Sequence, residues 1–345
     1  MINKFNDNSE KEIADLEELK ELYPKEPWRY KTLGILYEKE GKYEQALEFH
    51  TWYLKHNNSL DSNSYDRDTD NKPQIEKLNS AIENDPENAV LYCIRGMVYN
   101  RDSQFSMASD DFHKAIRLQP NLIMAYVYRA LGYCIRKFNH HVRKEVADDL
   151  LQALRIDDTI SLLHYELGYL YSRDIVFPPL CMDHNKIINC FDKALLYDPG
   201  FIQAYRERAL THEVNGNYKA AIDDLTCYLN HHVTLNGCGL TLAIRGDLYY
   251  KIGELDKAIE DYGIAIKSCE NDKVAFLFRL PEYYEKCGKC FESLNKEAKA
   301  KEDFKKAAKL RKKSDRFFKR GHSLLWRLFC LTKSKILNIV TSCNK

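Results

Sequence analysis

A pattern of apolar residues returns at fixed spacing along this chain, and it constrains the fold more than any other feature. In the stretch ASDDFHKAIRLQP, which begins at Ala108, an aromatic residue lies three places before an alanine, and a proline follows five places after that alanine. The aromatic-to-alanine spacing recurs at Phe191, Tyr262 and Phe304, and Pro199 repeats the proline. Such self-similarity is the signature of a repeat array, so the chain should fold as a series of similar units.

A second pattern lies upstream of these segments. Stretches such as YCIRGMVYN and HYELGYLYS align on a glycine. The aligned glycines are Gly34, Gly96, Gly132, Gly168 and Gly246, and the steps from Gly96 to Gly132 and to Gly168 are 36 residues each. A small residue inside a helix lets a second helix approach closely, and alanines such as Ala108 and Ala115 do the same from the partner helix. The two patterns predict units of two packed helices.

This arrangement resembles the tetratricopeptide repeat (TPR), a pair of antiparallel helices of roughly 34 residues with the pattern W-x2-L-G-x2-Y…A-x3-F…P. The segment from Tyr92 to Pro120 fits the pattern best. The resemblance implies an all-α fold, a right-handed superhelical solenoid of TPR-like antiparallel helix pairs. Seven units are expected, with first helices starting near Trp28, Val90, Tyr126, Leu162, Gln203, Leu240 and Ala275. Ala209 in the fifth unit and Pro281 in the seventh stand where the glycine is expected.

The regions outside the best repeats define the expected domain organisation. Residues 1–26, with a capping box at Ser9 and Glu12, are predicted to form an N-terminal capping helix. Residues 27–56 form the first TPR-like unit, and residues 57–72, polar and turn-rich, form a mobile loop. Residues 73–313 contain a lone second-type helix, marked by Ala81 and Pro86, and six TPR-like units. Residues 314–345 are predicted to be a basic and aromatic C-terminal helix or tail.

Composition narrows the class of protein. A chain that is 44% hydrophobic and 30% charged is typical of a folded protein. No secretory signal and no run of about eighteen apolar residues is evident, and eleven cysteines then indicate reduced thiols. We therefore expect a cytoplasmic protein, with the nucleus as the alternative. From Lys289 onward there are 17 basic and 5 acidic residues, whereas the preceding residues hold 35 basic and 46 acidic ones.

The sequence offers little that suggests catalysis. Adjacent carboxylates recur, as at Asp110 and Asp111, but neighbours on a helix do not face one another, and their place early in the second helix suits the helix dipole. The CGKC stretch from Cys287 to Cys290 lacks a second ligand pair, so we interpret these cysteines as packed residues. The paired histidines at 140–141 and 231–232 are interpreted as solvated turn residues. No nucleotide, hydrolase or metalloprotease motif is present, so we expect no enzyme activity, no cofactor and no metal.

The resemblance implies where a partner would bind. In this family partners usually bind the concave face through the second, fifth, ninth and twelfth positions of the first helix. The residues predicted to line this groove are Cys93, Met97, Asn100, Tyr126, Arg129, Tyr133, Arg136, Leu162, Tyr165, Tyr169, Arg206 and Leu210. Tyrosines with arginines suit a peptide or helix that carries apolar anchors and acidic residues. The alternative is that the tyrosines fill the space between helices.

The chain is therefore expected to be a non-catalytic adaptor or scaffold that binds a protein partner in the groove. A chaperone C-terminal tail is disfavoured as the partner, since Ile35, Met97 and Tyr165 stand where the tail-binding subset carries polar or basic residues. The basic tail, with Phe317, Trp326 and neighbouring aromatic residues, leaves alternatives open. It caps the array, folds back on the acidic body, or contacts an anionic membrane or nucleic acid, which would make the protein a membrane-surface or RNA-associated scaffold.

Overall fold

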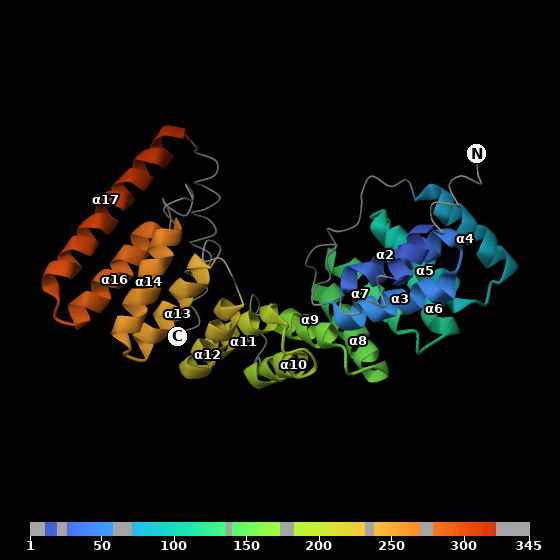
Figure 1. The fold of residues 1–345 in the computed structure, drawn as a ribbon, viewed down its shortest axis with the longest axis horizontal. Coiled ribbons are helices and arrows are strands. Elements are labelled where there is room, and N and C mark those ends of the chain that lie inside the picture. Colours follow the sequence, from blue (N-terminus) through green and yellow to red (C-terminus); the bar gives the residue numbers. More distant parts are fainter. Residues whose placement is uncertain are drawn as a thin grey trace. The chain divides into compact units, whose positions relative to one another are not determined.

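The computed structural model of the chain describes residues 11–18, 26–57, 71–135, 140–172, 183–231, 238–269 and 279–321. For residues 133–135, 140–143 and 316–321 it describes the backbone. All regular secondary structure in these ranges is helical (Figure 1). Most of the predicted loop after His56, and the tail beyond Gly321, lie outside the described residues. The chain divides into two compact units, Met1–Thr211 and His212–Lys345.

The first unit contains most of the helices. Residues 11–18 are helical and bury Ile13 and Leu16. The helices that follow are α2 (Pro27–Glu40), α3 (Tyr43–His56), α4 (Lys72–Asn84), α5 (Ala89–Arg101), α6 (Phe105–Leu118), α7 (Ile123–Ile135), α8 (His140–Ile156), α9 (Ser161–Ser172) and α10 (His184–Tyr197). Helix α11 (Ile202–Val214) begins in this unit and ends in the second. The second unit continues with α12 (Tyr218–Asn230), α13 (Gly239–Lys251), α14 (Leu255–Cys269), α16 (Leu280–Ser293) and α17 (Glu297–Gly321).

Consecutive helices form pairs, as the two sequence patterns predict. In the first unit α2 packs on α3, α5 on α6, α7 on α8 and α9 on α10, and in the second α13 packs on α14 and α16 on α17 (Figure 1). The second helix of one pair also contacts the first helix of the next, as α6 does with α7 and α14 with α16. The expected all-α solenoid of helix pairs is thus confirmed within each unit. We call the first helix of a pair its A helix and the second its B helix.

Small residues allow each A helix to approach its B helix. A Cβ atom on Gly96 would lie 2.7 Å from Cε1 of Phe112, and one on Gly246 would lie 2.8 Å from Cε1 of Tyr262. Both aromatic side chains are fully buried. Since a carbon atom cannot sit that close to a ring, glycine is required for the backbones to pack at this separation. This is the crossing that the glycine alignment predicts.

The third pair departs from the predicted alignment by two residues. The alignment places Gly132 at the crossing of α7 with α8, but a Cβ there would meet Oδ1 of Asn100 in α5, at 2.9 Å. The residue equivalent to Gly96 is Ala130, which lies 34 residues further on and is 1% exposed. The 36-residue interval is therefore wrong for this pair. Gly132 instead makes room for a side chain of the neighbouring A helix.

Equivalent hydrogen bonds in the second and third helix pairs support the 34-residue interval between them. The hydroxyl of Tyr92 donates to the carbonyl oxygen of Pro86 at 3.2 Å, and the hydroxyl of Tyr126 donates to that of Pro120 at 3.1 Å. Each tyrosine lies in the first turn of its A helix and bonds the turn that precedes it. The donor and the acceptor of the second bond each lie 34 residues after those of the first. Tyr92 and Tyr126 therefore occupy equivalent positions in the two helix pairs.

The seventh pair also differs from its prediction. Helix α16 begins at Leu280, later than the expected start near Ala275, and Pro281 occupies its first turn. A proline is tolerated there because the first turn has no intrahelical partner for its N–H group. The crossing residue is Gly288, where a Cβ would lie 2.7 Å from Cε1 of Phe304. The prediction that Pro281 replaces the glycine is therefore wrong.

The recurring carboxylate pairs have a more specific role than the helix dipole. In three helix pairs the second carboxylate is buried and receives two hydrogen bonds from an arginine of the A helix. This arginine immediately precedes the crossing residue in the sequence. These clamps are Arg95–Asp111, Arg129–Asp149 and Arg245–Asp261, with Nε to Oδ2 distances of 2.8, 2.9 and 2.8 Å. The first carboxylate of each pair is exposed. Bidentate pairing fixes both distance and orientation, so each clamp sets how its two helices cross.

A buried charged cluster joins the first helix pair to the helices that follow it. The carboxylate of Glu38 in α2 is fully buried and accepts from Nε2 of His50 at 2.8 Å, from Nε2 of Gln74 at 2.9 Å, and from Arg101. Burial by itself would raise the pKa of Glu38. The charge and hydrogen bonds of Arg101 and His50 outweigh that effect and lower the pKa to about 2. The Glu38 carboxyl is therefore ionised, and its charged form is stabilised by these partners.

The crossing geometry predicts opposite outcomes for two glycines of the same pair. Gly246→Ala should lower the free energy of unfolding by about 1–3 kcal/mol, because the methyl group overlaps the ring of buried Tyr262. Gly263→Ala in α14 should raise it by up to about 1 kcal/mol, since no atom lies within 4 Å of the new Cβ and alanine favours the helix. Urea unfolding followed by circular dichroism measures both. Equal effects of the two changes would contradict this packing.

The Glu38 cluster predicts that Arg101→Met destabilises the protein by about 3–5 kcal/mol, because it leaves a buried carboxylate without its guanidinium. The double variant Glu38→Gln/Arg101→Met should recover part of that loss, since the amide carries no charge. Urea unfolding of the three proteins tests this.

The same cluster sets a pH dependence. The folded-state pKa of Glu38, about 2, lies below its ordinary value of 4.5, so its contribution is present above about pH 4.5 and is lost as the pH falls toward about 2. The stability of Glu38→Gln should decline less over this window than that of the unmodified chain. An identical decline would show that the carboxylate is not held by its partners.

Candidate protein-binding surface

The A helices of the first unit share one face, which we call the A-helix face. It is formed by the second, fifth, sixth and ninth positions of α5, α7 and α9, the thirteenth position of α5, and Arg206 and Leu210 of α11, counted with the crossing residue as the eighth. Met97 and Arg101 belong to it in α5, Met124 and Tyr128 in α7, and Leu162, Tyr165 and Tyr169 in α9. A solenoid of helix pairs presents such a face as an extended surface.

Part of this face is covered by the chain's own first helix pair. Helix α3 contacts both α5 and α9, which are separated along the array by the α7–α8 pair. A helix that simply continued the stack would contact only the next pair. A small cavity marks the junction, lined by Lys31 and Ile35 of α2, His50 of α3, Met97 and Arg101 of α5, and Tyr128 of α7. The first pair therefore lies on the A-helix face.

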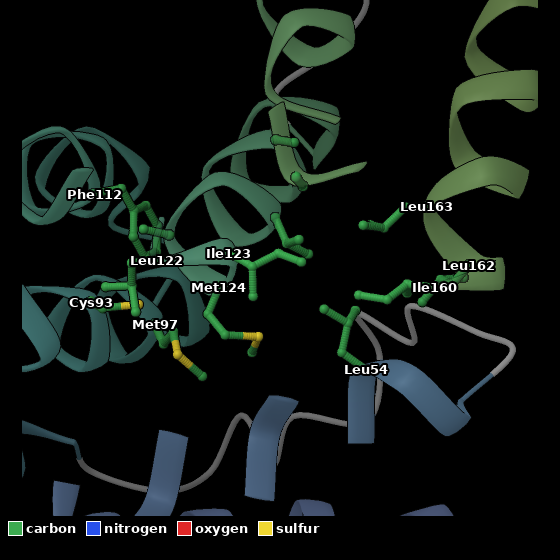
Figure 2. Close-up of a cluster of buried hydrophobic side chains, with 14 of the residues drawn as sticks. Leu54, Cys93, Met97, Phe112, Leu122, Ile123, Met124, Ile160, Leu162 and Leu163 are labelled. Atoms are coloured by element: carbon green, nitrogen blue, oxygen red, sulfur yellow. The ribbon is translucent and has the colours of Figure 1, made fainter. Parts of the chain in front are cut away.

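Leu54 near the C-terminal end of α3 is the apolar anchor of this contact. It is 3% exposed and belongs to the same buried cluster as Met124, Ile160 and Leu162. Figure 2 shows Leu54 reaching from the first helix pair toward Ile160 and Leu162 at the start of α9. The next residue, Lys55, places Nζ 2.6 Å from Oδ2 of Asp157 in the turn before α9. An apolar side chain and an ion pair thus hold this end of α3.

Beyond α3 the face continues over α9 and α11 and is partly exposed. The rings of Tyr165 and Tyr169 stack with centroids 6.0 Å apart. Burial, followed by the nearby charge of Glu207, raises the pKa of Tyr165 above its ordinary value, so its hydroxyl stays protonated. Arg206 of α11 donates to Glu207 at 3.1 Å, and its side chain remains 37% exposed. This stretch offers aromatic surface beside a solvated guanidinium.

The predicted groove residues fall into distinct environments. Cys93, Met97 and Leu162 are buried, so their side chains take part in packing. Asn100 donates to the carbonyl oxygen of Tyr128 at 2.9 Å and so joins two A helices. Tyr165 and Tyr169 of α9 and Arg206 and Leu210 of α11 are half-buried. Each of these last four keeps part of its side chain accessible to solvent.

Of the four residues predicted for the third unit, Tyr126 and Arg129 make contacts within the array. Tyr126 bonds Pro120 through its hydroxyl, and Arg129 is engaged by Asp149. The side chains of Tyr133 and Arg136 lie outside the described residues. With Ala130 at the crossing, the equivalent positions are Met124, Val127 and Leu131, which the glycine alignment missed. The 34-residue interval between Tyr92 and Tyr126 was the sequence signal that could have identified them.

The cysteines and histidines that the sequence singled out make contacts within the helices. Cys287 and Cys290 are buried in α16, and burial raises the pKa of the first thiol to about 12 and of the second to about 11. His231 bonds the carbonyl oxygen of Cys227 in the preceding turn. Among the described residues, no three His, Cys, Asp or Glu side chains gather closely enough to hold a metal ion. No helix within the described ranges has the length and apolar character needed to span a membrane.

Two comparisons of the sequence with known proteins find tetratricopeptide repeats. Residues 281–314 match the family model of the tetratricopeptide repeat. Human tetratricopeptide repeat protein 6 is 27% identical over 180 residues, which is 52% of this chain and 32% of the human protein. The match thus spans about a third of that relative's length.

Solved structures of similar chains have low sequence identity. YrrB, described as a TPR protein with an unusual peptide-binding site, is 18% identical, with a TM-score of 0.49 over 58% of this chain and 95% of that one. MamA is 21% identical, with a TM-score of 0.40 over 46% of this chain and 85% of its own. A monomeric mutant of IFIT1 with Gppp-AAAA is 17% identical, with a TM-score of 0.45 over 88% of this chain and 68% of its own.

The family match and the packing of the helix pairs agree on one register. The matched segment begins at Pro281 and puts Gly288 at the eighth position, where it crosses Phe304. The same register places Gly96 against Phe112 and Gly246 against Tyr262 in other pairs. Residues 281–314 therefore form a tetratricopeptide repeat, and the pairs that cross at Gly96 and Gly246 are packed in the same register.

Proposed function

We propose that this chain is a non-catalytic scaffold that binds a segment of a partner protein on its A-helix face. The observation that carries this proposal is the group formed by Tyr165, Tyr169, Arg206 and Leu210, which lie half-buried on neighbouring A helices. Aromatic residues and arginine are enriched where proteins bind one another, because they combine a large contact area with directed hydrogen bonds. The half-buried rings are pre-positioned by packing, so little order is lost on binding.

The chemistry of this group indicates the partner. Tyr165 is held between Phe191 and Phe201, with ring centroids 5.9 and 4.6 Å away. Its ring is therefore a fixed part of the surface. Tyr169 and Leu210 provide apolar contact, and the exposed part of Arg206 favours a carboxylate. A helix or extended peptide with an apolar anchor beside an acidic residue fits this pattern.

A crosslinking experiment tests the surface. A photoreactive amino acid at Tyr169 should crosslink a partner protein in cell extract, and Arg206→Glu should remove that crosslink by repelling the partner's carboxylate. The matched control is the same amino acid at Leu196, which is 70% exposed on B helix α10. Equal crosslinking from both positions, or a crosslink at Tyr169 that survives Arg206→Glu, would count against the proposal.

A second candidate function comes from α17. Lys305, Lys309 and Lys312 are exposed and recur at the spacing of one helix face, while Ala300 and Ala307 on the other side are buried. This positive stripe favours a scaffold that is localised by an anionic surface.

Reversing the charge of the stripe tests this second function. The triple change of Lys305, Lys309 and Lys312 to glutamate should weaken binding to phosphatidylserine vesicles or to single-stranded RNA by at least tenfold at low salt. The control reverses Lys301, which already pairs with Glu297 at 3.2 Å. Unchanged binding by the triple variant in both assays would dismiss localisation by α17.

A further inference from the structure

We propose that α3 is an exchangeable occupant of the A-helix face, and that an amphipathic helix of the partner takes the place of its Leu54 end at the start of α9. This inference rests on the proposed function, since it concerns the regulation of the same surface. It follows from three features of the first helix pair: how α2 and α3 hold each other, how each end of the pair is attached, and which side chains of α3 enter the face.

The first helix pair is well packed within itself. A Cβ on Gly34 would lie 2.6 Å from the ring of His50, so α2 and α3 cross as closely as any other pair. The rings of Tyr37 and Phe49 stack with centroids 5.1 Å apart, and Tyr30 stacks on Trp52. These contacts do not involve the A-helix face. The pair can therefore move away from that face without losing its own packing.

The two ends of the pair are attached differently. At one end the buried carboxylate of Glu38 bonds Gln74 and Arg101, and breaking such a cluster exposes unpaired charge in a dry interior. At the other end the ion pair of Lys55 with Asp157 is solvated, with side chains 41% and 21% exposed. A solvated pair contributes little. The Leu54 end is therefore the one that can open, with the Glu38 cluster as its pivot.

The middle of the contact is incompletely filled. The cavity lined by Ile35, His50, Met97 and Tyr128 lies between the first pair and the face, so these side chains forgo part of their possible packing. Nδ1 of His50 is buried there without a hydrogen-bond partner. The fit of α3 to the face is thus looser than the fit of α3 to α2, which favours exchange over permanent docking.

The contacts of α3 define what a replacement must carry. Leu54 fills the apolar site beside Ile160 and Leu162, and Lys55 reaches Asp157 (Figure 2). A partner helix with a leucine-like anchor followed by a basic residue reproduces both contacts. Its acidic residue would meet Arg206 further along the face. Because α3 is tethered to the face, it competes at a high effective concentration, and the partner must bind more tightly than α3 alone would.

A peptide experiment on the full chain tests the exchange. The probe is a fluorescent synthetic peptide of residues 43–57, the sequence of α3 itself. The unmodified chain should bind it weakly, because its own α3 occupies the site. A full chain with Leu54→Asp should bind it at least tenfold more tightly, and adding Leu162→Asp to that chain should abolish the gain.

Two controls keep the result specific. A chain with Glu48→Gln, a change at an exposed position of α3, should bind the peptide as weakly as the unmodified chain. A peptide that itself carries Leu54→Asp should bind neither chain. If the Leu54→Asp chain keeps its helical circular dichroism spectrum and binds the peptide no better than the unmodified chain, the proposal is overturned.

A second measurement needs no variant. Native-state hydrogen exchange should show that the backbone amides of residues 51–56 and 162–165 open together in a transition of lower free energy than global unfolding. Exchange of these amides only through global unfolding would overturn the proposal, even if Leu54→Asp failed to fold. Either negative result leaves the crosslinking test at Tyr169 unaffected, so failure of this inference is distinguishable from failure of the proposed function.

Discussion

The close crossing of an A helix with its B helix is the contact on which the rest of the structure depends. At Gly34, Gly96, Gly168, Gly246 and Gly288 the crossing places a glycine against a ring of the B helix, as at Gly96 with Phe112. Because the backbones are this close, a shift of one residue would drive a side chain into the opposing helix. The bidentate clamp one place before, as in Arg95–Asp111, then fixes the angle of the crossing. In the three pairs that carry the clamp, register and orientation are thereby set within the pair.

The A helices of the first unit form a continuous face, and part of this face is covered by helix α3 of the same chain. Helix α3 crosses from α5 to the start of α9, with Leu54 and Lys55 at its far end. The chain therefore supplies its own ligand for part of the surface that the repeats create. The buried carboxylate of Glu38 keeps one end of this ligand attached, at the cost of removing a charge from water.

The sequence predicted the candidate surface only in part. Tyr165, Tyr169, Arg206 and Leu210 are half-buried at the positions that the predicted register of α9 and α11 gives them. The residues predicted for the third unit are out of register with those of α5, because the alignment followed Gly132 when the crossing residue is Ala130. Alanine meets the need for a small side chain as well as glycine does, and it leaves a weaker signal. Arg129 looked available for a partner, but its guanidinium is engaged by Asp149.

The sequence by itself determined the helix pairs and their local packing, because the small residues, aromatic residues and prolines that define each pair lie within one unit of about 34 residues. Only the tertiary structure decided where α3 lies, how the Glu38 cluster is assembled and which part of the A-helix face stays accessible. Those features join residues far apart in the chain, such as Glu38 with Arg101 and Lys55 with Asp157. No periodic pattern encodes such contacts, since each occurs once and depends on shape and charge brought together by the fold.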